Sequence, residues 1–179
     1  MINSTNNRNK YIALFLSGLL SLFIYAPFYI YPIGFIIFTC YAYYLYNEEN
    51  YKVSIKLGAS FGVGYFLANL SWINFSLFVN NDIFRFLLPV SIIAIPAFFS
   101  LYFLIHAAIV KYLQKKYKLG LLGYYSVFSL IFFFVEYLRG NTILFIDFTG
   151  LPWNLLGYSL FVNLNFVQIA SIIGVYGLT

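Results

Sequence analysis

The sequence predicts an all-α fold, namely a polytopic helical membrane protein with about six transmembrane helices and a cytoplasmic N-terminus. Composition is the first observation, because 63% of the 179 residues are hydrophobic and only 8% are charged. The mean hydropathy of +0.86 suits a bilayer better than water. The second observation is a series of apolar runs, with room for about six spans of roughly 20 residues each. The third is the uneven placement of Lys and Arg between these runs.

Six apolar runs follow one another along the chain. They cover residues 11–26, 33–46, 55–79, 86–110, 119–138 and 160–179. Arg8 and Lys10 precede the first run as in a signal peptide, but no Ala-x-Ala-like cleavage site follows, so we expect a retained span. An aromatic turn with Pro27 and Pro32 leads to the second run, which is short enough to be tilted or partly interfacial.

The third and fourth runs carry residues that favour packing against other helices. Gly58 and Gly62 form a small-xxx-small pattern, which lets helix backbones approach closely. Pro89 and Pro96 should bend the fourth run, and His106 is interpreted as structural. Amides exposed to lipid would be unsatisfied, so the polar residues in the outer half of the third run should face other helices or a polar cavity. These residues include Asn69, Ser71, Asn74 and Ser76.

Lys and Arg indicate the orientation of the chain in the membrane. Eight of the ten lie in three polar segments, namely residues 1–10, 47–56 and 111–118. These three segments share one side, which the positive-inside rule assigns to the cytoplasm. Arg85 and Arg139 fall on the other side, together with residues 136–159. Because the basic residues form short clusters between apolar runs, nucleic acid is not an expected partner.

Residues 136–159 interrupt the apolar pattern and are the predicted meeting point with a substrate or a partner domain. Glu136 and Arg139 are three residues apart, so they share a helix face and can pair. Ionisable groups near hydrocarbon usually face protein or water, which leaves two interpretations: a structural ion pair at a helix end, or a substrate contact. Pro152 and Trp153 follow in a turn, where Trp153 is either an interfacial anchor or part of a site.

The residues by themselves do not indicate a catalytic centre. No Cys or Ser nucleophile has a plausible base beside it, and the sequence has neither a metal-ligand cluster nor a Gly-rich phosphate loop, so we expect no metal or cofactor. Cys40 is the single cysteine, which excludes an intrachain disulfide, and it is interpreted as structural. The last run is apolar to Thr179 without a basic flank, so we expect the sequence to be a fragment or one part of a split protein.

Three motifs in order resemble the apolipoprotein N-acyltransferase family. They are Glu-Tyr-Leu-Arg-Gly at 136–140, Thr-Gly-Leu-Pro-Trp-Asn at 149–154 and Gly-Tyr-Ser at 157–159. Further matching segments are Ala26-Pro27-Phe28, Gly62-x-Gly64-Tyr65-Phe66, Ser71-Trp72-Ile73 and Gly174-Val-Tyr-Gly177. The similarity covers nearly the whole chain, although the linker between Gly140 and Gly150 is several residues longer than is usual in the family.

The resemblance implies a function in lipoprotein biosynthesis. Members of this family are multi-pass enzymes of the bacterial inner membrane, which move an acyl chain from a phospholipid to the N-terminal cysteine of a lipoprotein. They join a helical membrane domain to a periplasmic nitrilase-like domain with a Glu-Lys-Cys triad, whose Cys forms a thioester that splits one hard step into two. Residues 1–179 would then be the N-terminal transmembrane domain, truncated before the nitrilase-like domain, with residues 136–159 on the periplasmic side.

The resemblance also implies a substrate site and partners. The expected substrate-binding residues are Glu136, Arg139, Gly150, Pro152, Trp153 and Tyr158. The implied partners are a phospholipid acyl donor, a lipoprotein acceptor and a possible, separately encoded nitrilase-like domain. No triad residue can be placed on this sequence, so the chain alone is expected to be inactive. The alternatives are a non-catalytic remnant or a partner subunit of a split enzyme; a small transporter is less favoured, since no inverted repeat is found.

Overall fold

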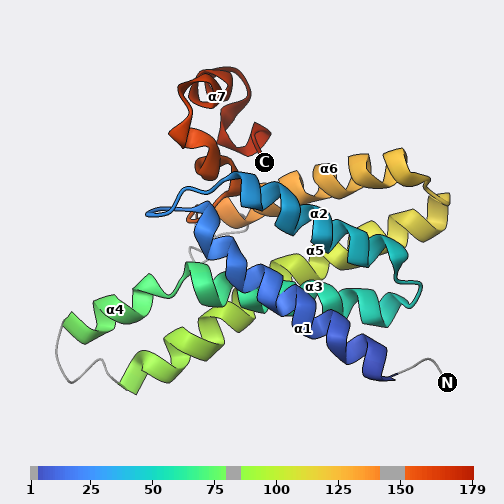
Figure 1. Cartoon of the computed structure of the whole chain (residues 1–179), viewed down its shortest axis with the longest axis horizontal. Coiled ribbons are helices and arrows are strands. Elements are labelled where there is room, and N and C mark those ends of the chain that lie inside the picture. The colour runs from blue at the N-terminus through green and yellow to red at the C-terminus, as the bar shows by residue number, and fades with distance from the viewer. Residues whose placement is uncertain (1–3, 80–85, 142–151) are drawn as a thin grey trace.

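A computed structural model describes residues 4–79, 86–141 and 152–179, and every element among them is a helix (Figure 1). The prediction of an all-helical chain is therefore confirmed for the described residues. The α-helices are α1 (Ser4–Leu20), α2 (Pro32–Asn47), α3 (Tyr51–Asn69), α4 (Trp72–Val79), α5 (Ile95–Tyr117), α6 (Leu121–Gly140) and α7 (Leu164–Gly177). Between them lie the 3-10 helices η1 (Ser21–Ile24) and η4 (Leu156–Val162) and the π-helical turn η3 (Val90–Ala94).

Local sequence explains where several helices begin and end. Pro32 opens α2 at a position where its missing N–H has no helical partner to lose. The Asn50 side chain caps α3 by accepting hydrogen bonds from the backbone N–H groups of Lys52 and Val53, at 3.0 and 3.3 Å. The α5 helix ends at Tyr117, and the next residue, Lys118, has a φ of 47° in the left-handed region that commonly terminates helices.

Among the described residues, two helical stretches are long and apolar enough to cross a membrane: Val90–Tyr117, with 28 residues, and Leu121–Gly140, with 20. These correspond to the fourth and fifth predicted spans. The apolar helix α7 is shorter. The predicted number of six spans stays a prediction.

The third and sixth predicted spans are not single helices. Residues 55–79 divide into α3 and α4 at residues 70–71, where the Ser71 hydroxyl donates to the Ala68 carbonyl at 2.8 Å and so competes with the backbone ladder. Residues 160–179 divide between η4 and α7, and Gly174 within α7 has a non-helical φ of 71°. Figure 1 shows α4 extending away from the bundle and α7 lying apart from it.

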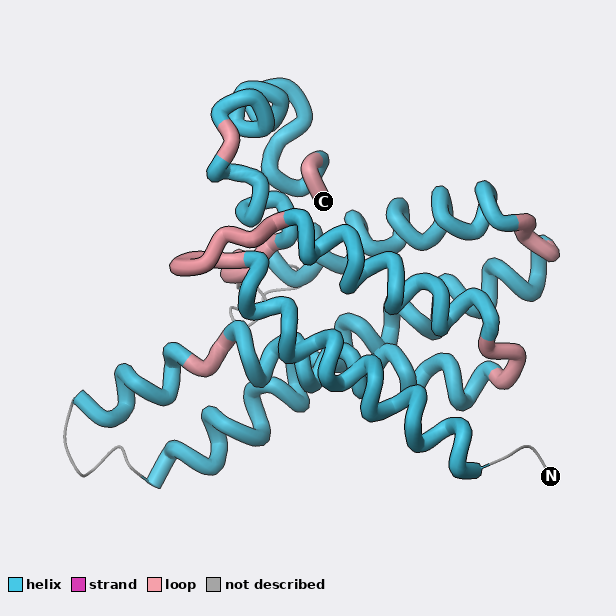
Figure 2. Tube along the Cα trace, viewed as in Figure 1, coloured by secondary structure: helices cyan, strands magenta, loops and turns pink. Residues whose placement is uncertain are grey.

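Helix α3 lies at the centre of the bundle, between α1 and α5 (Figure 2). The predicted small-residue pattern makes one of these contacts, because a Cβ added at Gly58 would lie 2.5 Å from the Phe103 carbonyl oxygen of α5. Aromatic rings fill the remaining space, with Tyr41 stacked on Phe61 at a centroid separation of 4.4 Å. His106 is fully buried, with its Nε2 3.1 Å from the Phe128 carbonyl. Since a carbonyl only accepts, His106 donates there, and this contact ties α5 to α6.

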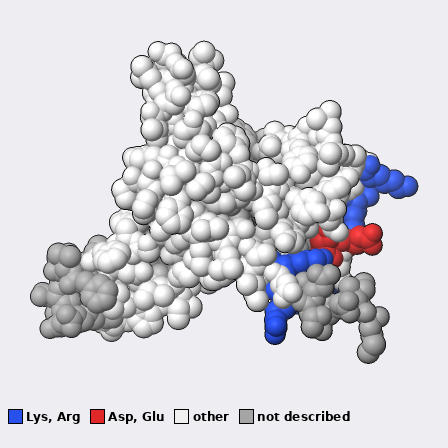
Figure 3. All heavy atoms as spheres, in the orientation of Figure 1, with Lys and Arg blue, Asp and Glu red and all other residues white. Residues whose placement is uncertain are grey.

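The predicted basic segments meet at one end of the bundle (Figure 3). Lys10 of α1 forms an ion pair with Glu48, just after α2, at 2.8 Å. Lys111 of α5 donates to the Leu45 carbonyl of α2 at 3.0 Å. Burial raises the pKa of the Glu48 carboxyl, but the bonds from Lys10 and from the Asn50 backbone N–H outweigh burial, and the pKa lies below its ordinary value.

Candidate functional site

The candidate site begins with the buried pair of Glu136 and Arg139 at the end of α6. Their exposed fractions are 3% and 2%, and Arg139 Nη2 lies 3.4 Å from Glu136 Oε1. They occupy one helix face, as their spacing predicts. The Arg139 guanidinium also lies over the Phe66 ring, 5.5 Å from its centroid, which covers the charge from the α3 side.

The pair binds the backbone of the turn that follows. Arg139 Nη1 donates to the Trp153 carbonyl at 2.6 Å, and Nη2 lies 3.3 Å from the Asn154 carbonyl. The Glu136 carboxylate accepts from the Leu156 N–H at 3.1 Å and from the Thr179 hydroxyl at 2.7 Å. Cation and anion therefore hold opposite ends of one short segment, which we call the 153–156 turn.

Two tyrosines hold the same turn from the other side. The Asn154 carbonyl lies 2.8 Å from the Tyr65 hydroxyl and 3.0 Å from the Tyr25 hydroxyl. The two hydroxyls also contact each other. The Asn154 side chain donates to the Asn69 carbonyl at the end of α3, at 2.7 Å. Sequence reasoning missed Tyr25 and placed Tyr65 only within a motif, because a tyrosine in an apolar run gives no sign that its hydroxyl bonds to a distant turn.

The outer surface of the turn borders a hollow of about 650 Å³, which we call the aromatic groove. Its lining residues are Tyr25, Ala26, Tyr29, Pro152, Trp153, Asn154, Tyr158, Phe161 and Val162. Trp153 is 53% exposed, and its ring centroid lies 5.3 Å from that of Trp72 at the start of α4. A mostly apolar hollow with a few hydroxyl and amide groups is typical of a site for an amphiphilic ligand.

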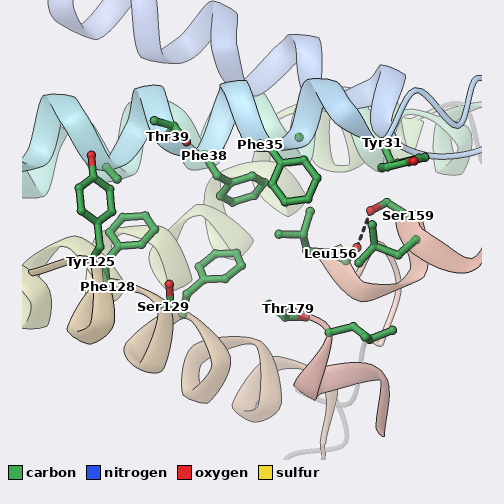
Figure 4. Close-up of a pocket in the computed structure, with 15 residues that line it drawn as sticks. Tyr31, Phe35, Phe38, Thr39, Tyr125, Phe128, Ser129, Leu156, Ser159 and Thr179 are labelled. Carbon is green, nitrogen blue, oxygen red and sulfur yellow. Dashed lines mark hydrogen bonds between the residues drawn. The ribbon is translucent and has the colours of Figure 1, made fainter. Parts of the chain in front are cut away.

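A second hollow of about 250 Å³ lies between α2 and α6, on the other face of η4 (Figure 4). Phe35 and Phe38 line it from α2, and Phe128 lines it from α6. Leu156 and Thr179 form its end, so two residues that donate hydrogen bonds to Glu136 also close this α2–α6 pocket. The 153–156 turn therefore separates the aromatic groove from the α2–α6 pocket.

Comparison with known families decides which group of proteins carries this arrangement. The family described as "Apolipoprotein N-acyltransferase N-terminal domain" matches residues 17–179. The chain belongs to the apolipoprotein N-acyltransferase family. The match includes the 153–156 turn, both residues of the buried pair and all described residues of the aromatic groove.

Curated relatives named apolipoprotein N-acyltransferase agree with this assignment. The chain is 32% identical to the protein of Rhodopseudomonas palustris over 92% of its own length and 30% of the relative's. The protein of Brucella melitensis is 31% identical over 97% of this chain and 33% of the relative. The protein of Rickettsia prowazekii is 30% identical over 96% and 32%. The chain thus spans about a third of the length of these relatives.

The structure places five of the six predicted site residues of this apolipoprotein N-acyltransferase domain, and they fall into two groups. Pro152, Trp153 and Tyr158 line the aromatic groove and are exposed. Glu136 and Arg139 are buried and bind the 153–156 turn from within. Gly150 lies outside the described residues.

Neither a metal centre nor a cysteine nucleophile is found at the groove. Among residues 4–79, 86–141 and 152–179, no group of three or more His, Cys, Asp or Glu side chains is arranged to hold a metal ion. Cys40 is half-buried on α2 and lines neither the aromatic groove nor the α2–α6 pocket. The described residues that line the groove include no Cys or Ser side chain, and their polar groups include tyrosine hydroxyls and the amide of Asn154.

Proposed function

We propose that this chain is the membrane domain of an apolipoprotein N-acyltransferase and that its aromatic groove receives the phospholipid acyl donor. The whole enzyme would transfer an acyl chain from that lipid to the N-terminal cysteine of a lipoprotein. The family match over residues 17–179 carries this proposal. The position of Pro152, Trp153 and Asn154 supports it, since these residues of the motif line a hollow of about 650 Å³.

Within this proposal, the six predicted site residues act at two depths. Pro152, Trp153 and Tyr158 would contact the lipid directly, and Gly150, which lies outside the described residues, stays a predicted substrate-binding residue. Glu136 and Arg139 would act indirectly, from inside the bundle, since their charged groups form hydrogen bonds with the backbone of Trp153 and Leu156. Of the two interpretations of the pair, its burial favours the structural ion pair, which fixes the turn against the bundle.

The chain would cross the bacterial inner membrane several times, with the groove on the periplasmic side. Support comes from the separation of charge: the basic segments gather at one end of the bundle, where Lys10 pairs with Glu48 (Figure 3). The groove lies near the opposite end of α6. The positive-inside rule then assigns the basic end to the cytoplasm.

The proposed catalytic residues belong to a nitrilase-like domain, either in the same polypeptide or separately encoded. The roughly threefold greater length of the relatives leaves room for such a domain. It would supply the Cys nucleophile and its Glu and Lys partners, while this chain supplies the lipid-side wall. By itself, this chain is expected to give no triacylated lipoprotein.

Lipid binding tests the groove directly. Trp153 lines the groove, and Trp72, the other Trp of the chain, packs on it, so their fluorescence should be quenched when a phosphatidylethanolamine with brominated acyl chains is titrated into the detergent-solubilised protein. Excess unbrominated lipid should restore the signal. Tyr158→Ala should shift the titration midpoint several-fold to higher lipid, because it removes part of the lining.

The matched control is Tyr43→Ala, which removes an exposed tyrosine of α2 that does not line the groove. Its midpoint should equal that of the unmodified chain. Quenching that unbrominated lipid fails to reverse, or equal midpoints for the two variants, would contradict a lipid site in the groove.

A further inference from the structure

The backbone at Asn154 has an unusual conformation that the surrounding contacts select. Its φ is 56°, within the left-handed region. Among residues other than Gly, Asn adopts this region most readily, because its short polar side chain is tolerated there. Asn154 directly follows Trp153, so this conformation sets the direction in which the Trp153 ring leaves the turn.

The Asn154 carbonyl is held by groups from three distant parts of the chain. The tyrosine hydroxyls lie at 2.8 and 3.0 Å and Arg139 Nη2 at 3.3 Å. Tyr25 and Tyr65 have two hydroxyl protons between them but make three contacts, two with the carbonyl and one with each other. At most two of these contacts are hydrogen bonds at once. Both hydroxyls lie within hydrogen-bond distance of the Asn154 carbonyl, so either tyrosine can donate to it when the other does not.

The Asn154 side chain adds a fourth contact, directed at the break between α3 and α4. Its amide donates to the Asn69 carbonyl at 2.7 Å. The last carbonyls of a helix lack intrahelical partners, and this bond satisfies one of them. Trp72 is the first residue of α4, immediately beyond the break, and its ring packs on Trp153.

We infer that Asn154 is the positioning residue of the aromatic groove: its carbonyl and amide together fix Trp153 beside Trp72. The carbonyl anchors the turn to Tyr25, Tyr65 and Arg139, while the amide anchors it to the end of α3. The Trp pair forms where the two anchored segments meet. The inference rests on the proposed function only in treating this groove as the lipid site.

The two indoles provide the measurement, since closely packed indoles give an exciton couplet in circular dichroism. In the chain of residues 1–179 in detergent, Asn154→Gly keeps the left-handed conformation accessible and removes only the amide, so it should lose part of the couplet. Asn154→Ala disfavours the conformation as well and should lose most of it. The Tyr65→Phe change alone should be mild, because Tyr25 still donates, whereas Tyr25→Phe with Tyr65→Phe should weaken the couplet strongly.

Helix content measured on the same samples shows whether each variant folds. Trp72→Phe must abolish the couplet, and Asn47→Ala, which removes an exposed side chain at the end of α2, should leave it intact. An undiminished couplet in Asn154→Gly, or in the double tyrosine variant, would overturn the inference.

The brominated-lipid titration separates this inference from the proposed function. If the unmodified chain shows the couplet but no lipid quenching, the proposed function fails while the role of Asn154 stands. If both signals are present, Asn154→Ala should weaken lipid binding in proportion to the lost couplet. Full lipid affinity without the couplet would show that Asn154 does not position the groove.

Discussion

Arg139 shows how one buried side chain can organise a turn fourteen residues away. Its guanidinium reaches the Trp153 carbonyl with one nitrogen and Glu136 with another. Arginine suits this position because its planar fork offers several donors in fixed directions. The same burial makes the pair interdependent, since removing one member leaves the other charge in an apolar surrounding.

Arg139→Ala should therefore destabilise the domain by about 3–5 kcal/mol, because Glu136 loses its buried counter-ion. Thermal unfolding in detergent measures this loss. Adding Glu136→Gln to Arg139→Ala removes the stranded charge and should restore part of the stability. Lys116→Ala removes an exposed basic side chain; it is the control and should change the stability little. Equal instability of Arg139→Ala with and without Glu136→Gln would show that the charge is not the cause.

Among the elements, α3 depends most on close backbone contact. Gly64 faces the Phe15 carbonyl of α1, and Gly58 faces Phe103 and Ala107 of α5. A side chain at either position would meet backbone atoms, which cannot move aside as a flexible side chain can. The helix thus holds its two neighbours at the separation that brings Tyr65 and Asn69 to the 153–156 turn.

Gly58→Ala should lower stability by about 1–3 kcal/mol, because the added Cβ overlaps α5. The comparison is Gly123→Ala in α6, where the nearest atom, a side-chain carbon of Leu119, lies 3.6 Å from the new Cβ. This second change should be neutral or stabilising by up to about 1 kcal/mol, because Ala favours the helix over Gly. Midpoints of thermal unfolding compare the two variants. A smaller loss for Gly58→Ala than for Gly123→Ala would exclude the packing contact.

At the scale of the whole molecule, the two ends differ in chemistry. One end gathers Lys and Arg around the Lys10–Glu48 pair (Figure 3), and the other carries the aromatic groove. The α5 and α6 helices connect these ends through lengths that suit a bilayer. Because the basic end and the groove lie at opposite ends, the orientation of the chain in the membrane decides on which side the groove opens.

The proposed orientation can be tested by cysteine labelling. In a Cys40→Ser background, Lys115→Cys should be protected from an impermeant thiol reagent added to intact cells, and Asn165→Cys on α7 should react. Both positions are exposed, so access depends on the side of the membrane rather than on burial. Permeabilised cells provide the control, in which both cysteines should react. The reverse pattern in intact cells would exclude a periplasmic groove.

The sequence alone determined the helical class and the segregation of Lys and Arg. It also identified the segment around Glu136 and Trp153 as an interruption of the apolar pattern. Each of these follows from composition or from spacing along one helix, so it can be read locally. Tertiary structure decided the rest: the break between α3 and α4, the burial of Arg139, and the tyrosines that bind Asn154. Tyr65 and Asn154 are 89 residues apart, and their hydrogen bond exists only because helix packing brings them together. A pattern within one segment carries no information on such a contact, since the partner that satisfies a buried polar group is selected by three-dimensional proximity.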